Sequence, residues 1–167
     1  LGRMRKPDVT VPDTPPPSEL VVIDDASPDA DLAQDLRRLA EAGLFTLKVH
    51  ATNQGFVATA NSAMQLHPRR DVVLLNADTE VYDGWLDRLK SAALRHPSTA
   101  TVTPLANNAM ICSYPRTRQD NPYPLEISYP ALNALAAEVN DGVEVEAPRG
   151  VGFCLYMRRA CLDEVGV

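Results

Sequence analysis

The sequence has 167 residues, of which 45% are hydrophobic, and this length and composition suit one domain with one buried core. Lys and Arg number 16 and Asp and Glu number 22, so the net charge of −6 argues against nucleic-acid binding, which requires a basic face. No apolar run approaches the roughly 18 residues of a transmembrane helix, and three cysteines without zinc-ligand spacing indicate buried thiols in a reducing, cytoplasmic compartment.

Apolar runs alternate with helix-like segments along the chain, which predicts an α/β fold with right-handed crossovers and a mainly parallel sheet. Strands are expected at residues 8–12, 19–24, 46–51, 71–76, 99–103 and 153–157. Helices are expected between Ser27 and Gly43, from Phe56 to His67, from Asp83 to His96, and over 130–139 and 159–165. Residues 104–130 are expected to be mostly loop, either an acceptor groove or a proline-braced surface segment.

Two helix starts carry a capping signal. Ser27 precedes Pro28 and is the predicted N-cap of the first helix, and Asp83 is the predicted N-cap of the third. Residues 13–17 hold three consecutive prolines and leave no crossover between the first two strands, although a parallel pair needs about a dozen connecting residues. We therefore expect residues to be missing between about Val11 and Thr14.

Polar residues directly follow three of the expected strands. They form the segments Asp24-Asp25-Ala26-Ser27, Asn53-Gln54-Gly55 and Asn76-Ala77-Asp78-Thr79-Glu80. Ligands of an open parallel sheet bind beyond the carboxyl ends of its strands, so these segments are the first candidates for a site. Their carboxylates and amides suit a nucleotide and a divalent cation, because Mg²⁺ and Mn²⁺ take oxygen ligands, often only one or two from protein.

Four segments, in this order, resemble family 2 glycosyltransferases of the GT-A fold. They are ELVVIDDASPD at 19–29, NQGFVATAN at 53–61, DVVLLNADTEV at 71–81 with Gly84-Trp85-Leu86, and GVGFCLYMRR at 150–159. The resemblance implies a Rossmann-like sheet flanked by helices and a nucleoside-diphosphate sugar as the sugar donor. It further implies inverting transfer to a hydroxyl of a glycan or lipid-linked acceptor, in polysaccharide or cell-envelope glycan synthesis, with peripheral association at the inner membrane face as one possibility.

The same resemblance implies roles for single residues. Asp25 matches the acidic residue that pairs with the nucleobase, and Asp78 matches the ligand that holds Mg²⁺ or Mn²⁺ against the diphosphate. Asn76 stands where many relatives have Asp, which removes one negative charge from the cation site. The full sugar-donor set is Asp24, Asp25, Ser27, Asn53, Gly55, Asn61, Asn76, Ala77 and Asp78, and Gly150 and Gly152 lie on the acceptor side. We expect Asp25 and Asp78 to face each other across one crevice.

The catalytic base of relatives lies beyond the segment that corresponds to 150–159, so we assign no base in this sequence. We expect the single domain over 1–167 to be incomplete, without its first strand-helix unit and its base-bearing segment. A fragment that binds the nucleotide-sugar without turnover therefore stays open as an alternative.

Other interpretations of the same residues also stay open. The segments around Asp24 and Asp71 resemble a receiver domain of two-component signalling, but Asn76 stands where that chemistry needs Asp, and no Lys follows Thr103. A degenerate receiver-like interaction module remains as the alternative from another class. A nucleotidyltransferase would need a glycine-rich loop with Arg near the start of the sheet, and residues 9–18 contain none. His50 is expected to be a structural residue within a strand.

Overall fold

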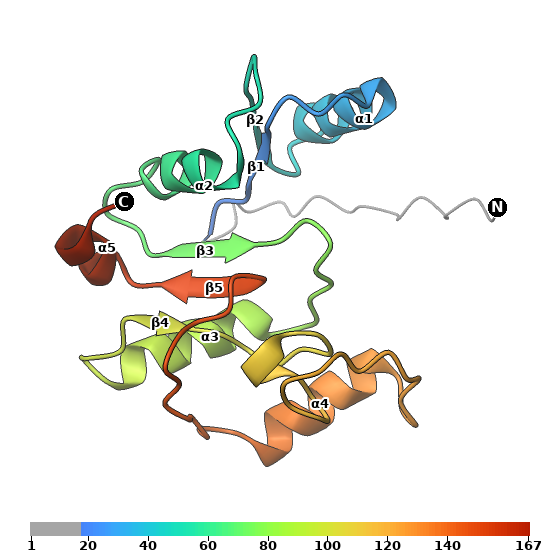
Figure 1. Cartoon of the computed structure of the whole chain (residues 1–167), viewed down its shortest axis with the longest axis vertical. Coiled ribbons are helices and arrows are strands. Elements are labelled where there is room, and N and C mark those ends of the chain that lie inside the picture. Colours follow the sequence, from blue (N-terminus) through green and yellow to red (C-terminus); the bar gives the residue numbers. More distant parts are fainter. Residues whose placement is uncertain (1–17) are drawn as a thin grey trace. The chain divides into compact units, whose positions relative to one another are not determined.

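The structure is a computed structural model that describes residues 18–167 (Figure 1). The strand expected at 8–12 and the segment expected to be missing lie outside the described residues. The chain divides into two compact units, a first that ends at Leu66 and a second from His67 to Val167. Each unit is described by itself below.

The first unit contains two parallel strands and two helices. The β-branched run Val21–Asp24 forms β1 and Thr46–Val49 forms β2, and Asp24 is the register partner of Val49. The helices are α1, Ala30–Glu41, and α2, Phe56–Met64. Because both strands run in the same direction, the residues that follow them, Asp25 and His50, lie at the same end of the strand pair. The strand predicted over 46–51 ends two residues earlier, which places His50 just beyond it.

Helix α1 begins two residues later than predicted, and Ser27 is not its N-cap. The N-cap is Asp29, whose side chain accepts hydrogen bonds from the amides of Asp31 (2.9 Å) and Leu32 (3.1 Å). The Ser27 amide instead donates to Asp24 Oδ1 at 2.8 Å, so the residues from 24 to 27 form a separate turn. The predicted end is confirmed, since Gly43 follows the helix at φ 78°.

The second unit contains a three-stranded sheet with the order β3-β5-β4. Its strands are Val72–Leu75 (β3), Thr101–Val102 (β4) and Cys154–Met157 (β5), and β5 is antiparallel to both neighbours (Figure 1). Strands β3 and β4 therefore run in the same direction, joined through α3, Trp85–Arg95. Parallel pairing of adjacent strands is confined, among the described residues, to β1 and β2.

The α/β class is confirmed, and the antiparallel β5 has a simple origin. Between β4 and β5 the chain makes a long excursion that holds a short 3₁₀ helix, η1, Met110–Cys112, and helix α4, Tyr129–Val139. It then returns and inserts between β3 and β4 from the opposite end, before helix α5, Arg159–Val165. Strand direction thus follows the route of the chain, which the local residue pattern of 153–157 does not encode.

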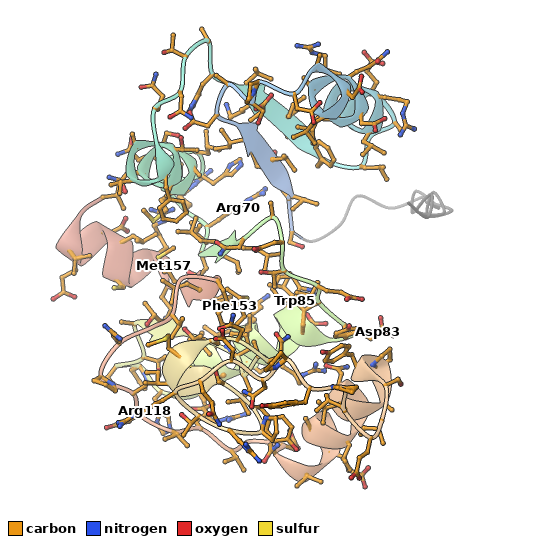
Figure 2. All side chains as sticks on the ribbon, turned by 45° about the vertical axis from the view of Figure 1, so that its right-hand side comes forward. Arg70, Asp83, Trp85, Arg118, Phe153 and Met157 are labelled. Carbon is orange, nitrogen blue, oxygen red and sulfur yellow. The ribbon has the colours of Figure 1, made fainter. Side chains whose placement is uncertain are left out.

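The core of the second unit lies between α3 and β5. Leu89 and Ala93 of α3 pack with Cys154 and Tyr156 of β5, and four partly buried residues surround them: Val73, Trp85, Val102 and Phe153. Trp85 and Phe153, labelled in Figure 2, both pack against this core. All three cysteines are free, but only Cys154 is buried as predicted, whereas Cys112 and Cys161 are partly exposed. Burial raises the pKa of the Cys154 thiol to about 11.

The start of α3 differs from the prediction, because Asp83 makes no side-chain cap. Gly84 is the N-cap at φ 73°, a left-handed conformation that glycine adopts without strain. The Asp83 carbonyl accepts from Arg88 Nη1 at 3.0 Å and from Asn133 Nδ2 at 3.2 Å. Asn133 belongs to α4, so these bonds connect the start of α3 to α4 rather than capping a helix.

Candidate functional site

The first candidate segment is organised by the carboxylate of Asp25. Its Oδ1 lies 2.7 Å from Nδ1 of His50 and accepts the Gln54 amide at 2.9 Å, and its Oδ2 accepts the Gly55 amide at 2.8 Å. Asn53 Nδ2 also donates to the Asp25 carbonyl at 3.2 Å. One acidic residue after β1 therefore holds the whole segment that leads from β2 into α2.

Three predicted sugar-donor residues of this unit, Asn53, Gly55 and Asn61, lie in or after this segment. Gly55 is the N-cap of α2 with φ 79° and ψ 161°, a conformation that a side chain would strain. Asn53 is exposed and its Oδ1 accepts the Gly55 amide at 3.0 Å, whereas Asn61 is partly buried within α2. The structure thus brings Asp25, Asn53 and Gly55 together in direct contact, with Asn61 on the helix that follows.

Hydrogen bonding lowers the pKa of both adjacent carboxyls. For Asp25 the largest cause is the Gln54 amide, followed by the His50 side chain. For Asp24 the cause is the Ser27 backbone and side chain. The nearby Thr59 hydroxyl also lowers the pKa of Asp25. The buried Thr59 Oγ1 is nevertheless outside hydrogen-bond geometry and has no hydrogen-bond partner in the described part of the chain. Both acids are therefore ionised at neutral pH.

These lowered pKa values predict an acid-sensitive first unit. A carboxyl whose pKa lies below its ordinary 3.8 in the folded chain stabilises the fold above that value, and the stabilisation is lost as the pH falls through the folded pKa. We expect the melting temperature of Asp24→Asn, whose amide oxygen can still accept the Ser27 amide, to fall less between pH 5 and pH 3 than that of the wild type. Equal losses in the two proteins, measured by circular dichroism, would contradict the contribution assigned to Asp24.

The third candidate segment begins with the turn after β3, Asn76 to Thr79. The Asn76 amide donates to the Phe153 carbonyl at 2.9 Å, and the Thr79 amide closes the turn on the Asn76 carbonyl at 3.1 Å. Asn76, Ala77 and Asp78 are exposed. In residues 18–167 no hydrogen bond or ion pair engages the Asp78 carboxylate, so its oxygens are open to a ligand.

The residues around Asp78 fit a cation only in one coordination mode. No group of three His, Cys, Asp or Glu side chains in the described chain could hold a metal ion. Mg²⁺ and Mn²⁺ nevertheless bind through one or two carboxylates when substrate phosphates supply further oxygens. A single open carboxylate fits that mode and does not fit a site made of protein alone.

Of the two predicted acceptor-side glycines, Gly152 lies beside this turn, because it directly precedes Phe153, whose carbonyl accepts the Asn76 amide. A Cβ on Gly150 would lie 2.5 Å from Leu155 Cδ1, so a larger residue there would need that side chain to shift. A Cβ on Gly152 would meet nothing within 4 Å. Pairing of β3 with β5 thus brings Asn76, Asp78 and Gly152 to one end of the sheet.

The comparison with protein families decides what these segments belong to. The model of the family described as glycosyl transferase family 2 matches residues 8–166, nearly the whole chain and all three candidate segments. The chain belongs to glycosyl transferase family 2. Comparisons with curated proteins and with solved structures gave no match.

Membership of glycosyl transferase family 2 supports several expectations at their general level. It implies the GT-A, Rossmann-like fold, glycosyl transfer as the activity, and a nucleotide-sugar and an acceptor as the substrates. Family 2 enzymes commonly use divalent metals. In residues 18–167, no helix has both the length and the apolar character needed to cross a bilayer.

Two further observations bear on this glycosyltransferase. His50, expected to be merely structural, contacts Asp25 directly, and the signal that could have revealed it is the parallel pairing of the two strands that precede these residues.

Asp25 and Asp78 belong to the first and second unit respectively, so their expected approach across one crevice stays a prediction.

The two arginines after β5 have structural partners. Arg158 Nη1 donates to the Pro97 carbonyl at 2.8 Å, and Arg159 Nη2 donates to the His67 carbonyl at 3.0 Å. These contacts join the end of β5 to the loops before β4 and β3.

Proposed function

We propose that this chain binds a nucleoside-diphosphate sugar and transfers the sugar, with inversion, to a hydroxyl of a glycan or lipid-linked acceptor in polysaccharide or cell-envelope glycan synthesis. The observation that carries the proposal is the family match over residues 8–166, which includes all three candidate segments. Asp25 and the Asn53–Gly55 residues that contact it, called the Asp25 segment, are assigned to the nucleoside. The turn from Asn76 to Thr79, called the Asp78 turn, is assigned to the diphosphate.

The hydrogen bonds of Asp25 support its role toward the nucleoside. An ionised carboxylate offers about four acceptor directions, and the His50 imidazole, the Gln54 amide and the Gly55 amide use three of them. One direction at Oδ2 is left for an N–H group of a nucleobase. The exposed side chains of Ser27 and Asn53 add hydrogen-bonding groups around it.

The open carboxylate of Asp78 supports its role toward the diphosphate. Asp78 would hold Mg²⁺ or Mn²⁺ with the phosphates as the other ligands, while the neutral amide of Asn76 is suited to hydrogen-bond the ribose. When bound, such a cation neutralises negative charge that develops on the departing diphosphate. Inversion also needs a base opposite the leaving group, and we assign that role to no residue of this sequence.

A thermal-shift screen with nucleoside diphosphates tests the proposal. We expect uridine, guanosine or thymidine diphosphate, at about a hundred times its Kd, to raise the melting temperature by about 5 °C, with a larger rise when Mn²⁺ is present. Mn²⁺ alone and the corresponding nucleosides are the controls. No shift with any diphosphate would refute the proposed sugar-donor site, whereas binding without sugar transfer would favour a non-catalytic nucleotide-sugar-binding fragment.

A further inference from the structure

The contact between His50 and Asp25 is the shortest of the three hydrogen bonds that the Asp25 carboxylate makes. Asp24 and Val49 are register partners, so Asp25 and His50 are the first residues beyond two parallel strands. Nδ1 of His50 lies 2.7 Å from Oδ1 of Asp25, and the side chains are 24% and 20% exposed. Because Asp25 is ionised at neutral pH, its oxygen accepts, and His50 Nδ1 carries the proton and donates.

This hydrogen bond helps to fix the orientation of the Asp25 carboxylate. Oδ1 receives both the imidazole and the Gln54 amide, so rotation of the carboxylate about its last torsion would break two bonds. With Oδ1 fixed, Oδ2 is held on the Gly55 amide, and its remaining acceptor direction is fixed as well.

The His50 imidazole is not needed to hold the backbone at the carboxyl ends of β1 and β2. The amide of His50 donates to the Asp24 carbonyl at 2.9 Å, and Asn53 Nδ2 donates to the Asp25 carbonyl. Both bonds survive if the His50 side chain is removed, and so does the pairing of β1 with β2. Loss of the imidazole should therefore remove one of the three hydrogen bonds that orient the carboxylate, without unfolding the unit.

We propose that His50 is a positioning residue for sugar-donor binding: its Nδ1–H orients the Asp25 carboxylate and keeps the Asn53–Gly55 segment ready to receive the nucleoside. The inference rests on the proposed function, because it assigns to His50 a part in that same site. His50 acts through Asp25 and is not itself assigned a contact with the nucleotide.

Three substitutions of His50 in the full chain test this role. His50→Ala removes the imidazole, His50→Asn places an amide nitrogen where Nδ1 was, and His50→Gln places one nearer to the position of Nε2. Calorimetric titration uses the nucleoside diphosphate that gives the largest thermal shift with the wild type. We expect about tenfold weaker binding for the Ala and Gln variants and recovery to within about threefold for the Asn variant.

The outcomes separate this inference from the proposed function. His96→Ala, which removes an imidazole from the second unit, is the matched control and should bind like the wild type. Wild-type affinity in His50→Ala, or equal weakening in the Asn and Gln variants, would overturn the positioning role while leaving the proposed function intact. If the wild type binds no nucleoside diphosphate, both fall. If circular dichroism shows that His50→Ala is unfolded, the Asn and Gln variants decide by the same criterion.

Discussion

Replacing Asp25 by Asn is expected to weaken nucleoside diphosphate binding by about a hundredfold. The substitution keeps the shape of the side chain but removes the charge that three hydrogen bonds share. It also turns an NH₂ group toward His50 Nδ1–H and the Gln54 amide, or toward the Gly55 amide, so two donors would face each other in either orientation. The Gln54 and Gly55 amides then lose the carboxylate that accepts hydrogen bonds from both of them.

Calorimetric titration measures this loss, with Asp35→Asn as the control. Asp35 lies on α1, where its side chain is exposed and hydrogen-bonds only to Arg38. The control removes the same charge from the same unit and should change the affinity by less than twofold. Binding by Asp25→Asn that stays within twofold of the wild type would mean that the Asp25 segment is not part of the sugar-donor site.

Replacing Asp78 by Ala is expected to remove the cation-dependent part of both binding and transfer. Asp78 is exposed and engages no other described residue, so the melting temperature of the free chain should change by no more than about 1 °C. Without this carboxylate the affinity in Mn²⁺ should fall to the value measured in EDTA. Any transfer activity of the wild type should fall about a hundredfold or more, because charge on the leaving group is no longer neutralised.

The matched control is Asp87→Asn, which removes a carboxylate from the first turn of α3 in the same unit. It should leave the difference between Mn²⁺ and EDTA unchanged. An Asp78→Ala variant that keeps the full effect of Mn²⁺ would show that another residue holds the cation.

The sequence was sufficient for the elements that local chemistry determines. The β-branched residues before Asp24, the apolar spacing of α1 and the glycine after it predicted real elements with errors of one or two residues at most boundaries. The segments after β1, β2 and β3 were identified because polar residues follow strand ends. Two of these segments meet in the first unit through Asp25, and the third is the open turn that holds Asp78.

The two wrong helix starts have different origins, one in a local contact and one partly in a contact between distant parts of the chain. Ser27 carries an ordinary capping signal, but its amide donates to Asp24, only three residues before it, in a separate turn, and Asp29 caps the helix. Asp83 likewise has its carbonyl taken by Arg88 and by Asn133, a residue 50 positions later. The bond from Asn133 has no local signature in the sequence.

Chemical-shift mapping on the ¹⁵N-labelled chain tests the assignment of the sugar-donor residues most directly. We predict that uridine, guanosine or thymidine diphosphate shifts the amide resonances of Gln54 and Gly55, and that adding Mg²⁺ shifts those of Ala77 and Asp78. Saturable changes confined to other residues, with these four amides unaffected, would contradict the account.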